Sequence, residues 1–553
     1  MFHLCVTNKL GLVYVLTSPK LSAAKILKPT FLQHANSNYP MFNLSTVLED
    51  SARKYSEKDA FIYAKNHFSF AQINGAANQI ANGLKEAGIK QGDRIALSCL
   101  NLPYFPILYF GILKAGAIVV PLSVLLKRDE ISYHLRDSGA KAYFCFEGTS
   151  ELPMAQEGLA GFQEASECEQ LYIITAQPAD PSPIEGVKTM GQLMANQVSE
   201  FETVQTSADD TAVIIYTSGT TGRPKGAELT HSNLIHNAII SNGILDLETE
   251  DKQLIVLPLF HIFAMTVLMN SGIYKGATSV LLPRFDAEEV LGLMQKHSIS
   301  IFAGVPTMYW GLLSYDNTKF DLKSIAKNLK TCVSGGAALP VNVLENFEAK
   351  FNVSILEGYG MSEGSPVVTF NQKEFGCKPG SVGTPVWGVE VKVVDDSGNE
   401  VPTGEKGELV YRGHNVMKGY YNKPEANKET LKNGWLHSGD VAVKDEDGFF
   451  FIVDRTKEMI IRKGLNVYPR EVEEVMMKHE AVSMVAVIGV RDEEAGEEIK
   501  AFVVLNKGFE LSESALMDWT KEHIASYKYP RIIQFMDALP MSATGKILKK
   551  ELN

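Results

Sequence analysis

The chain has no pair of cysteines at the C-x-x-C spacing that zinc sites and redox motifs use. Its six cysteines are scattered along 553 residues, which argues against a disulfide framework and is typical of a reducing cytosol. Cys332 follows Lys330 and Thr331 on an apparent buried strand, so we expect a core residue there rather than a nucleophile. The six are Cys5, Cys99, Cys145, Cys168, Cys332 and Cys377.

Long apolar runs and an excess of positive charge are also missing. The most apolar stretch, residues 109–126, is interrupted by Lys114 and Pro121, so no membrane-spanning helix is expected. The net charge of −12 argues against a general partner of nucleic acids or of anionic membranes. Hydrophobic residues make up 45% of the chain and charged residues 21%, as in ordinary globular proteins. We expect a cytoplasmic protein, at most peripheral to the inner membrane.

Acidic residues are absent from the first 40 positions, which carry four lysines and a short apolar run at residues 10–16. That run is too short for a convincing signal peptide. We expect residues 1–40 to be an unstructured extension, or to follow a start codon placed upstream of the true one, because a helical pattern opens at Met41.

The body of the chain alternates short apolar runs with helical patterns such as residues 103–114. This alternation is typical of βαβ units around a largely parallel sheet. Glycine and proline become frequent between residues 376 and 413, where antiparallel strands or a small barrel are expected at 388–394 and 407–411. The other expected strands are 94–100, 117–121, 141–146, 253–257, 278–282, 299–303 and 329–334.

The pattern changes after Arg455. A helix that opens at Pro469 is followed by strands at 482–490 and 499–505 and by a helix at 513–524, which together predict a compact α+β unit. We therefore predict an α/β fold with a large N-terminal domain of βαβ layers, a small β-barrel-like part, and a mobile α+β C-terminal domain. The predicted boundaries are 1–40 for the extension, 41–454 for the large domain and 455–553 for the C-terminal domain.

A loop rich in serine, threonine and glycine follows the strand-like run at 212–215. Residues 216–227 read Tyr-Thr-Ser-Gly-Thr-Thr-Gly-Arg-Pro-Lys-Gly-Ala. Its glycines let the backbone approach a polyphosphate, its hydroxyls can donate to phosphate oxygens, and its lysine supplies charge. A mobile, solvated loop could share this composition, but the order is rarer than the composition. The residues concerned are Thr217, Ser218, Gly219, Thr220, Thr221, Gly222 and Lys225.

This loop resembles the signature of the adenylate-forming superfamily, which includes acyl- and aryl-CoA synthetases, peptide-synthetase adenylation domains and luciferases. Four further motifs of that superfamily follow in the expected order, and the similarity runs from about Met41 to the C-terminus. They are Gly-Tyr-Gly-Met-Ser-Glu at 358–363, Gly-Trp-Leu-His-Ser-Gly-Asp at 434–440, Asp-Arg-Thr-Lys at 454–457 and Ser-Ala-Thr-Gly-Lys at 542–546. The resemblance implies that a carboxylic acid and ATP form acyl-AMP and pyrophosphate, after which coenzyme A takes the acyl group.

The resemblance also implies a nucleotide site. Tyr359 would stack on adenine, and Asp440 would bind the ribose hydroxyls with Arg455 as its partner. Ser362 replaces the usual threonine of its motif and keeps the hydroxyl. The implied ATP- and AMP-binding residues are Thr217, Ser218, Gly219, Thr220, Thr221, Gly222, Lys225, Gly335, Gly336, Ala337, Glu357, Gly358, Tyr359, Gly360, Met361, Ser362, Asp440, Arg455 and Lys546.

Three residues carry the implied catalysis. Glu363 and Thr217 would hold Mg²⁺ against the phosphates, since this hard cation prefers oxygen ligands. Attack of a carboxylate on the α-phosphate brings two anions together, so a bridging cation lowers the barrier. In the family a lysine near the C-terminus does this, and Lys546 occupies that position, although a lysine in a polar tail is generically a solvated surface residue.

The acyl pocket and the coenzyme A channel are implied by position. His261, in Pro-Leu-Phe-His-Ile-Phe at 258–263, lies where the family places an aromatic residue or histidine near the carboxylate. Phe263 and Met265 would line the same pocket, and an adaptable methionine suits an alkyl chain. A histidine beside apolar residues is as often a satisfied core group.

For the second step, Lys457 occupies the family's hinge position. Lys463 and Gly464 match the loop beside the coenzyme A channel, where a pantetheine arm would leave no room for a β-carbon. Arg284 resembles a basic contact to the nucleotide of coenzyme A, or is equally a charge at a sheet edge.

Several readings compete. Gly-Met-Ser-Glu-Gly at 360–364 satisfies the G-x-S-x-G pattern of serine hydrolases, but a nucleophile elbow leads directly into a helix, whereas residues 366–368 favour an extended segment. Within the superfamily, the sequence most resembles those of bacterial fatty-acyl-CoA synthetases. We predict medium- to long-chain fatty acids, ATP and coenzyme A as substrates; an aryl-acid ligase and an adenylate-only enzyme are the alternatives. No nucleic-acid partner is expected, and a homodimer is left open.

Overall fold

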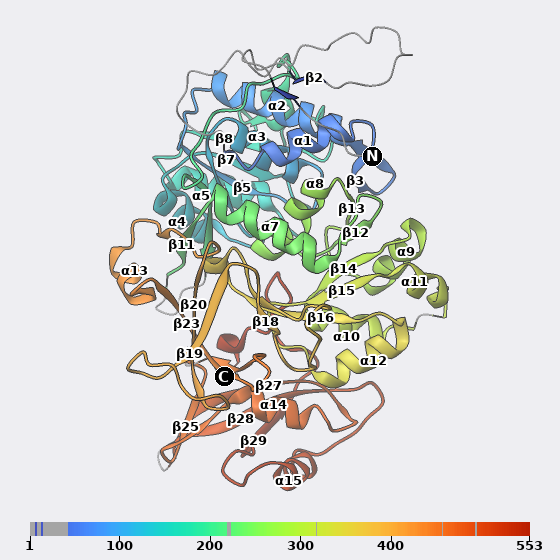
Figure 1. Cartoon of the computed structure of the whole chain (residues 1–553), viewed down its shortest axis with the longest axis vertical. Helices are drawn as coiled ribbons and strands as arrows, with labels where there is room; N and C mark the ends of the chain where they lie inside the picture. Colours follow the sequence, from blue (N-terminus) through green and yellow to red (C-terminus); the bar gives the residue numbers. More distant parts are fainter. Residues whose placement is uncertain are drawn as a thin grey trace. The chain divides into compact units, whose positions relative to one another are not determined.

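The computed structural model describes residues 6–7, 13–14, 42–217, 223–316, 318–455, 457–492 and 495–552 (Figure 1). The chain divides into two units, Met1–Pro40 and Met41–Asn553. In the first, β1 (Val6–Thr7) pairs antiparallel with β2 (Val13–Tyr14). The expectation for the rest of residues 1–40, and the predicted roles of Ser218, Gly219, Thr220, Thr221 and Gly222, lie outside the described residues.

The first large sheet has eight strands in the order β21-β11-β10-β6-β5-β7-β8-β9. The six strands from β10 to β9 run parallel, and β11 and β21 add an antiparallel edge. The strands are β5 (Arg94–Ser98), β6 (Ile118–Pro121), β7 (Ala140–Phe146), β8 (Gln170–Ile174), β9 (Lys188–Thr189), β10 (Thr211–Thr217), β11 (Lys225–Thr230) and β21 (Gly419–Tyr420).

The second large sheet has nine strands in the order β18-β17-β16-β15-β14-β12-β13-β3-β4. Its six strands from β16 to β3 are parallel, and β17, β18 and β4 are antiparallel additions. The strands are β3 (Asp59–Tyr63), β4 (Asn66–Ser69), β12 (Lys252–Ile255), β13 (Thr278–Leu281), β14 (Ile301–Gly304), β15 (Thr331–Ser334), β16 (Ile355–Gly360), β17 (Val367–Phe370) and β18 (Thr384–Pro385). The predicted α/β class with largely parallel sheets is confirmed.

Helices connect the parallel strands, as crossover connections require. Five of the helices described here begin at a side chain that caps the first turn; Thr230, for example, accepts a hydrogen bond from the backbone N–H of Asn233 at the start of α7, which satisfies a free amide. The helices of this part are α1 (Thr46–Lys54), α2 (Phe70–Glu86), α3 (Tyr104–Lys114), α4 (Arg128–Ser138), α5 (Met154–Glu164), α6 (Met190–Met194), α7 (His231–Leu245), the π-helix η2 (Phe263–Asn270), α8 (Ser271–Lys275), α9 (Ala287–His297), α10 (Pro306–Ser314), α11 (Leu322–Asn328), α12 (Val341–Phe351), the 3₁₀ turn η3 (Ser362–Gly364) and α13 (Pro424–Thr430).

Helix α3 contains the first part, residues 109–114, of the most apolar stretch of the sequence. It is buried along almost its whole length, as a helix that is apolar on every face must be. The charge that interrupts the stretch, Lys114, is 1% exposed and forms an ion pair with Glu49 of α1. No helix among the described residues is long and apolar enough to cross a membrane.

The small antiparallel part is a five-stranded sheet in the order β19-β20-β23-β22, with β24 paired to β23. It contains β19 (Val389–Val394), β20 (Lys406–Gly413), β22 (Leu431–Lys432), β23 (Trp435–Lys444) and β24 (Phe450–Arg455). Phe449, which precedes β24, is 6% exposed.

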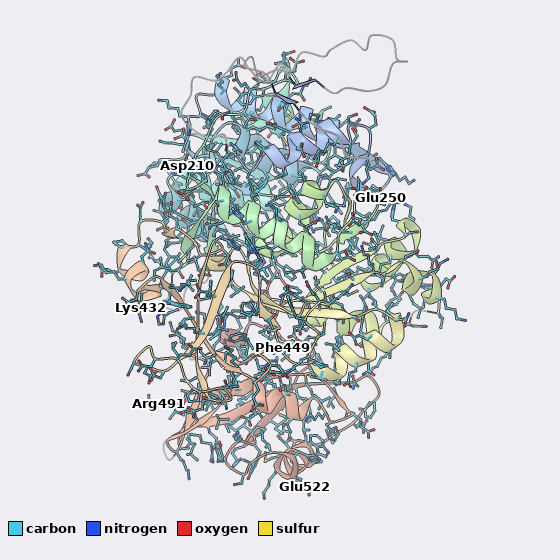
Figure 2. All side chains as sticks on the ribbon, viewed as in Figure 1. Asp210, Glu250, Lys432, Phe449, Arg491 and Glu522 are labelled. Carbon is cyan, nitrogen blue, oxygen red and sulfur yellow. The ribbon has the colours of Figure 1, made fainter. Side chains whose placement is uncertain are left out.

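Charged side chains lie on the surface in every part of the chain. Glu250, Lys432 and Glu522 are examples, and all three are exposed (Figure 2).

The C-terminal part has its own sheet and its own apolar clusters. Strands β27 and β28 form a long antiparallel pair, and β29 joins β28 in parallel. Its elements are β25 (Ile460–Arg462), β26 (Leu465–Val467), α14 (Pro469–Met476), β27 (Val482–Asp492), β28 (Gly496–Leu505), α15 (Glu513–His523), β29 (Ile532–Phe535) and the turn η4 (Lys549–Glu551). The predicted α+β character of this part is confirmed.

Candidate functional site

Glu363 lies where three distant segments meet. Its side chain is on η3 and the residue is 5% exposed. The hydroxyl of Thr217, at the end of β10, donates to Glu363 Oε1 at 3.2 Å, and the hydroxyl of Tyr420 donates to the same oxygen at 2.8 Å. No described residue donates to Oε2. The structure therefore brings the two predicted metal ligands together and leaves one carboxylate oxygen for a further partner.

The chain on either side of the glycine-rich loop is held by helix α4. The hydroxyl of Tyr216, in β10, donates to Asp137 at 2.9 Å. On the other side, the hydroxyl of Tyr133 donates to the carbonyl of Pro224 at 2.7 Å. Lys225 stands 5.2 Å from the centre of the Tyr420 ring. These contacts fix both ends of the loop, whose residues 218–222 are not described.

Asp440 joins the second group of predicted residues. It lies in β23, is 7% exposed, and accepts a hydrogen bond from the hydroxyl of Tyr359 in β16. Arg455 of β24 lies opposite it, with Nε 3.3 Å from Asp440 Oδ1. Burial raises the pKa of the Asp440 carboxyl, and Arg455 acts against that rise. The arrangement presents an aromatic ring beside a paired carboxylate.

A third group lines the ends of β15 and β16. A β-carbon on Gly335 would stand 3.3 Å from the Phe263 ring, and one on Gly336 would stand 3.5 Å from Cε of Lys546. Ala337 is exposed beside them. Glu357 is 2% exposed, accepts the backbone N–H of Leu339 at 3.0 Å, and has a pKa raised by burial to about 7.

Lys546 is presented by a tight hairpin in the C-terminal part. The N–H of Ser542 donates to the carbonyl of Lys546 at 2.8 Å, and the N–H of Lys546 donates to Ser542 Oγ at 3.1 Å. Gly545 has φ +77°, a left-handed conformation that favours glycine. Its carbonyl accepts the hydroxyl of Thr307, in α10, at 3.2 Å. The hairpin is thereby attached to the large part of the chain.

The electrostatics of Lys546 show what it faces. Burial and the nearby Arg455 lower the pKa of the Lys546 ammonium to about 8, while Asp440 and Glu363 act to raise it. Burial, together with Lys546, lowers the pKa of His261 to about 4. Charged residues from three other motifs, Glu363, Asp440 and Arg455, therefore act on one ammonium group, although they are far apart in the sequence.

His261 leads into the π-helix η2, a rare form that is often found at functional sites. The backbone N–H of Phe263 donates to Nδ1 of His261 at 3.3 Å, so the neutral ring carries its proton on Nε2. Phe263 is half-buried and faces Gly335, whereas Met265 is fully buried. A neutral imidazole can donate one hydrogen bond to a carboxylate.

The structure does not bring the predicted coenzyme A residues to this cluster. Arg284 is exposed between β13 and α9, and Lys457 is exposed after β24. Lys463 and Gly464 form an exposed turn between β25 and β26. A β-carbon on Gly464 would meet no protein atom within 4 Å, so the protein itself does not crowd this position, and the predicted approach of a pantetheine arm stays a prediction. The glycine is suited to its φ of +79°.

Tyr420, Asp137 and Thr307 were missed in the sequence. Each is an ordinary turn or helix residue in its local context, and only the fold places it against a motif. The sequence near these residues offers one feature, the two consecutive tyrosines Tyr420 and Tyr421. Such pairs are too common to have identified a partner of Glu363.

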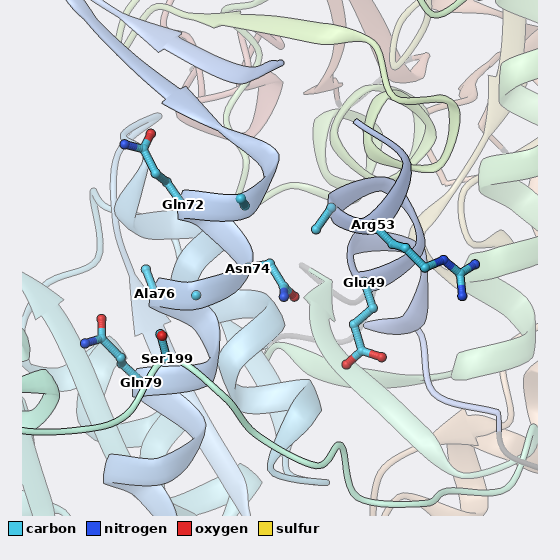
Figure 3. A pocket seen from close by; sticks show the side chains of 10 residues that line it. Glu49, Arg53, Gln72, Asn74, Ala76, Gln79 and Ser199 are labelled. Carbon is cyan, nitrogen blue, oxygen red and sulfur yellow. The ribbon is translucent and has the colours of Figure 1, made fainter. Parts of the chain in front are cut away.

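A surface hollow of about 640 Å³ lies away from these residues, between α1 and α2 (Figure 3). Glu49 and Arg53 line one side, and Gln72, Asn74 and Gln79 line the other. None of the predicted site residues lines it, and it is open to solvent rather than enclosed as a typical small-molecule pocket is.

The environment of Ser362 differs from that of a hydrolase nucleophile. Ser362 begins η3, after which the chain passes through Pro366 into β17 rather than into a helix. No histidine among the described residues forms a hydrogen bond with it. We expect the Ser362→Ala variant to keep ligase activity within about tenfold of the wild type, because only a hydroxyl at the rim of the site is lost. Acid-dependent pyrophosphate release measures this; loss of nearly all activity would revive a nucleophilic role.

Comparison with known proteins assigns the family. Residues 48–421 match the family model described as AMP-binding enzyme, and residues 471–546 match that of the AMP-binding enzyme C-terminal domain. The chain belongs to the AMP-binding enzyme family. The predicted boundary at residue 455 falls between the two matched segments.

The similar proteins are CoA ligases. A long-chain-fatty-acid–CoA ligase of Bacillus subtilis (strain 168) is 36% identical over 538 residues, covering 93% of this chain and 94% of the relative. A feruloyl-CoA synthase of Amycolatopsis sp is 36% identical over 503 residues, covering 91% and 96%. The crystal structure of the anthranilate CoA ligase AuaEII with anthranoyl-AMP matches with a TM-score of 0.85 and 31% identity, covering 93% and 97%. This member of the family is an AMP-forming acid–thiol ligase.

Proposed function

We propose that the enzyme is a fatty-acid–CoA ligase of the cytoplasm that acts on medium- to long-chain acids. The observation that carries its first reaction is the position of Lys546 beside Asp440, Arg455 and His261. The 36% identity with a long-chain-fatty-acid–CoA ligase supports the fatty-acid substrate. An aryl acid is the second candidate, since a feruloyl-CoA synthase is equally similar.

The adenylation step follows from this arrangement. A carboxylate oxygen of the acid attacks the α-phosphorus of ATP, a P–O bond forms, and the bond to pyrophosphate breaks. Lys546 lies between the two anions and reduces their repulsion, which is largest in the transition state. Neutral His261 donates its Nε2–H to the acid and orients the attacking oxygen. Asp440 accepts hydrogen bonds from the ribose hydroxyls, and adenine stacks on the ring of Tyr359.

The oxygen donors of Thr217 and Glu363 fit Mg²⁺, which prefers oxygen and keeps several non-protein ligands. Glu363 Oε2 accepts no hydrogen bond from a described residue, and the described part of the chain has no group of three histidine, cysteine or acidic residues placed so that they could hold a metal ion by themselves. These residues would therefore hold the ion together with phosphate oxygens and water. When bound, it would neutralise charge on the leaving pyrophosphate.

The second step requires a change of partners. We infer that residues 455–553 form a mobile domain that turns at Lys457 after adenylation and withdraws the Lys546 hairpin. The thiol sulfur of coenzyme A then attacks the acyl carbonyl, loses its proton, and displaces AMP. Lys463, Gly464 and Arg284 would serve this step. Their exposure in the present arrangement fits that order of events, because the cluster around Lys546 is already assembled for the first step.

The substrate is tested by pyrophosphate release across a panel of acids. With ATP and coenzyme A present, we expect medium- and long-chain fatty acids to give a kcat/KM at least about tenfold above that for ferulate, benzoate and anthranilate, the range that pocket contacts usually discriminate. Preference for an aromatic acid by orders of magnitude would replace the fatty-acid assignment. Acyl-CoA is quantified in parallel, and pyrophosphate without acyl-CoA would indicate an adenylate-only enzyme.

A further inference from the structure

The stretch of β23 that carries Asp440 departs from a regular strand. The pairing of β20 with β23 shifts register between Glu408 and Val410, and the pairing of β23 with β24 shifts between Val441 and Ala442. Gly439, which lies within the first of these irregularities, has φ +73°. Irregularities of this kind re-aim side chains next to active sites. The direction of the Asp440 carboxylate is therefore not fixed by ladder hydrogen bonds alone.

Glu408 supplies the contacts that the ladder lacks. The backbone N–H of Gly439 donates to Glu408 Oε1 at 3.0 Å, and Nδ1 of His437 lies 2.7 Å from Oε2. The two carboxylate oxygens of Glu408 thus contact the two residues that flank Ser438. A hydrogen bond to a charged carboxylate is about twice as strong as a neutral one, so this one side chain strongly restrains the turn.

Ser438 completes the restraint from the neighbouring residue of β20. Its hydroxyl donates to the carbonyl of Leu409 at 2.6 Å and accepts the backbone N–H of Asp440 at 3.1 Å. Residues 437–439 each bond to the pair Glu408-Leu409, and Asp440 is linked to that pair through the hydroxyl of Ser438. The last member of the series is the residue whose side chain meets Tyr359 and Arg455.

We propose that Glu408 is the positioning residue for ribose recognition: it holds the turn at residues 437–439 so that Asp440 is aimed at the ribose hydroxyls of ATP. This rests on the proposed function. Glu408 acts on the turn through the backbone N–H of Gly439, whereas Tyr359 and Arg455 contact the Asp440 carboxylate directly. The glutamate itself does not touch the nucleotide in this proposal.

The test compares ATP with 2′-deoxy-ATP and 3′-deoxy-ATP in acid-dependent pyrophosphate release. A carboxylate aimed at the hydroxyls makes the wild type prefer ATP, and the preference is a ratio of kcat/KM values. In Glu408→Ala, we expect kcat/KM for ATP to fall about tenfold or more while that for the deoxy analogues changes little, so that the preference largely disappears. Asp440→Ala is the reference for its complete loss.

Two further variants separate positioning from damage to the fold. Glu408→Gln keeps an oxygen for the Gly439 N–H and an amide donor for His437, so it should keep the preference. Glu408→Asp keeps the charge but draws it back by one methylene, so it should lose most of the preference even if the alanine variant fails to fold. Glu405→Ala, an exposed glutamate just before β20, is the matched control and should behave as the wild type.

Each other outcome overturns the proposal. Equal losses with ATP and its deoxy analogues would make Glu408 merely structural. A wild type without preference, or a Glu408→Asp variant that retains it, would remove the link between Glu408 and ribose. Absence of pyrophosphate release from the wild type with every acid is a different result, because it would refute the proposed function itself.

Discussion

Replacement of Lys546 by alanine should reduce acid-dependent pyrophosphate release by a factor of about a hundred to a thousand, the usual cost of removing one preorganised charge from a transition state. Thioester formation from supplied acyl-adenylate should stay within a few-fold of the wild type, because the proposed second step proceeds after this hairpin has withdrawn. The two half-reactions are measured separately, one as pyrophosphate release and the other as acyl-CoA formed without ATP.

The reason for so large an effect is the surrounding charge. In the proposed reaction Lys546 is the cation that bridges the carboxylate and the α-phosphate, and burial together with Arg455 lowers its pKa to about 8. An ammonium group that is already held in place away from water stabilises the transition state at little free-energy cost, because its surroundings need not rearrange during the reaction. Bound ATP and acid, both anionic, would raise this pKa again and so favour the charged form.

A matched control is available four residues away. Lys550 is exposed, so Lys550→Ala removes the same charge from the same tail without touching the cluster. It should leave both half-reactions unchanged. If Lys546→Ala slowed both half-reactions equally, the division of labour between two arrangements of the C-terminal domain would be wrong.

The sequence predicted those parts of the molecule in which local pattern and final structure agree. Short apolar runs gave the parallel strands, and a proline at position 469 marked the start of α14. Strand ends were less well predicted. A strand was expected at residues 253–257, but β12 extends over Lys252–Ile255. Val256 and Leu257 are each 2% exposed, so burial continues after the ladder ends, and hydrophobicity alone does not separate the two.

The site shows the same division. Lys546, Asp440 and Glu363 could be named because they stand in ordered motifs, whereas Tyr420 and Glu408 stand in segments that resemble any turn or edge strand. Their roles depend on pairings across long distances in sequence: 57 residues separate Tyr420 from Glu363, and 31 separate Glu408 from Gly439. Such pairings follow from strand order and register, which a single sequence does not reveal.

Replacement of Glu363 by glutamine should have the second large effect, a fall in pyrophosphate release of about a hundredfold at low Mg²⁺ concentration. Glutamine has the same shape, and its oxygen can still accept hydrogen bonds from the hydroxyls of Thr217 and Tyr420, so the local fold should persist. What is lost is the negative charge, and with it most of the attraction for a hard divalent cation. Raising the Mg²⁺ concentration should therefore restore part of the activity.

The measurement is a Mg²⁺ titration of pyrophosphate release, compared with that of Tyr420→Phe. The phenylalanine variant removes one hydrogen bond to Glu363 Oε1 but leaves the carboxylate charge intact. Its Mg²⁺ dependence should shift by less than about tenfold, in keeping with the loss of a single hydrogen bond to a charged group. A Glu363→Gln enzyme with the wild-type Mg²⁺ dependence would show that this carboxylate does not hold the ion, and the cation would then have to be bound by the phosphates and other oxygen donors of the site.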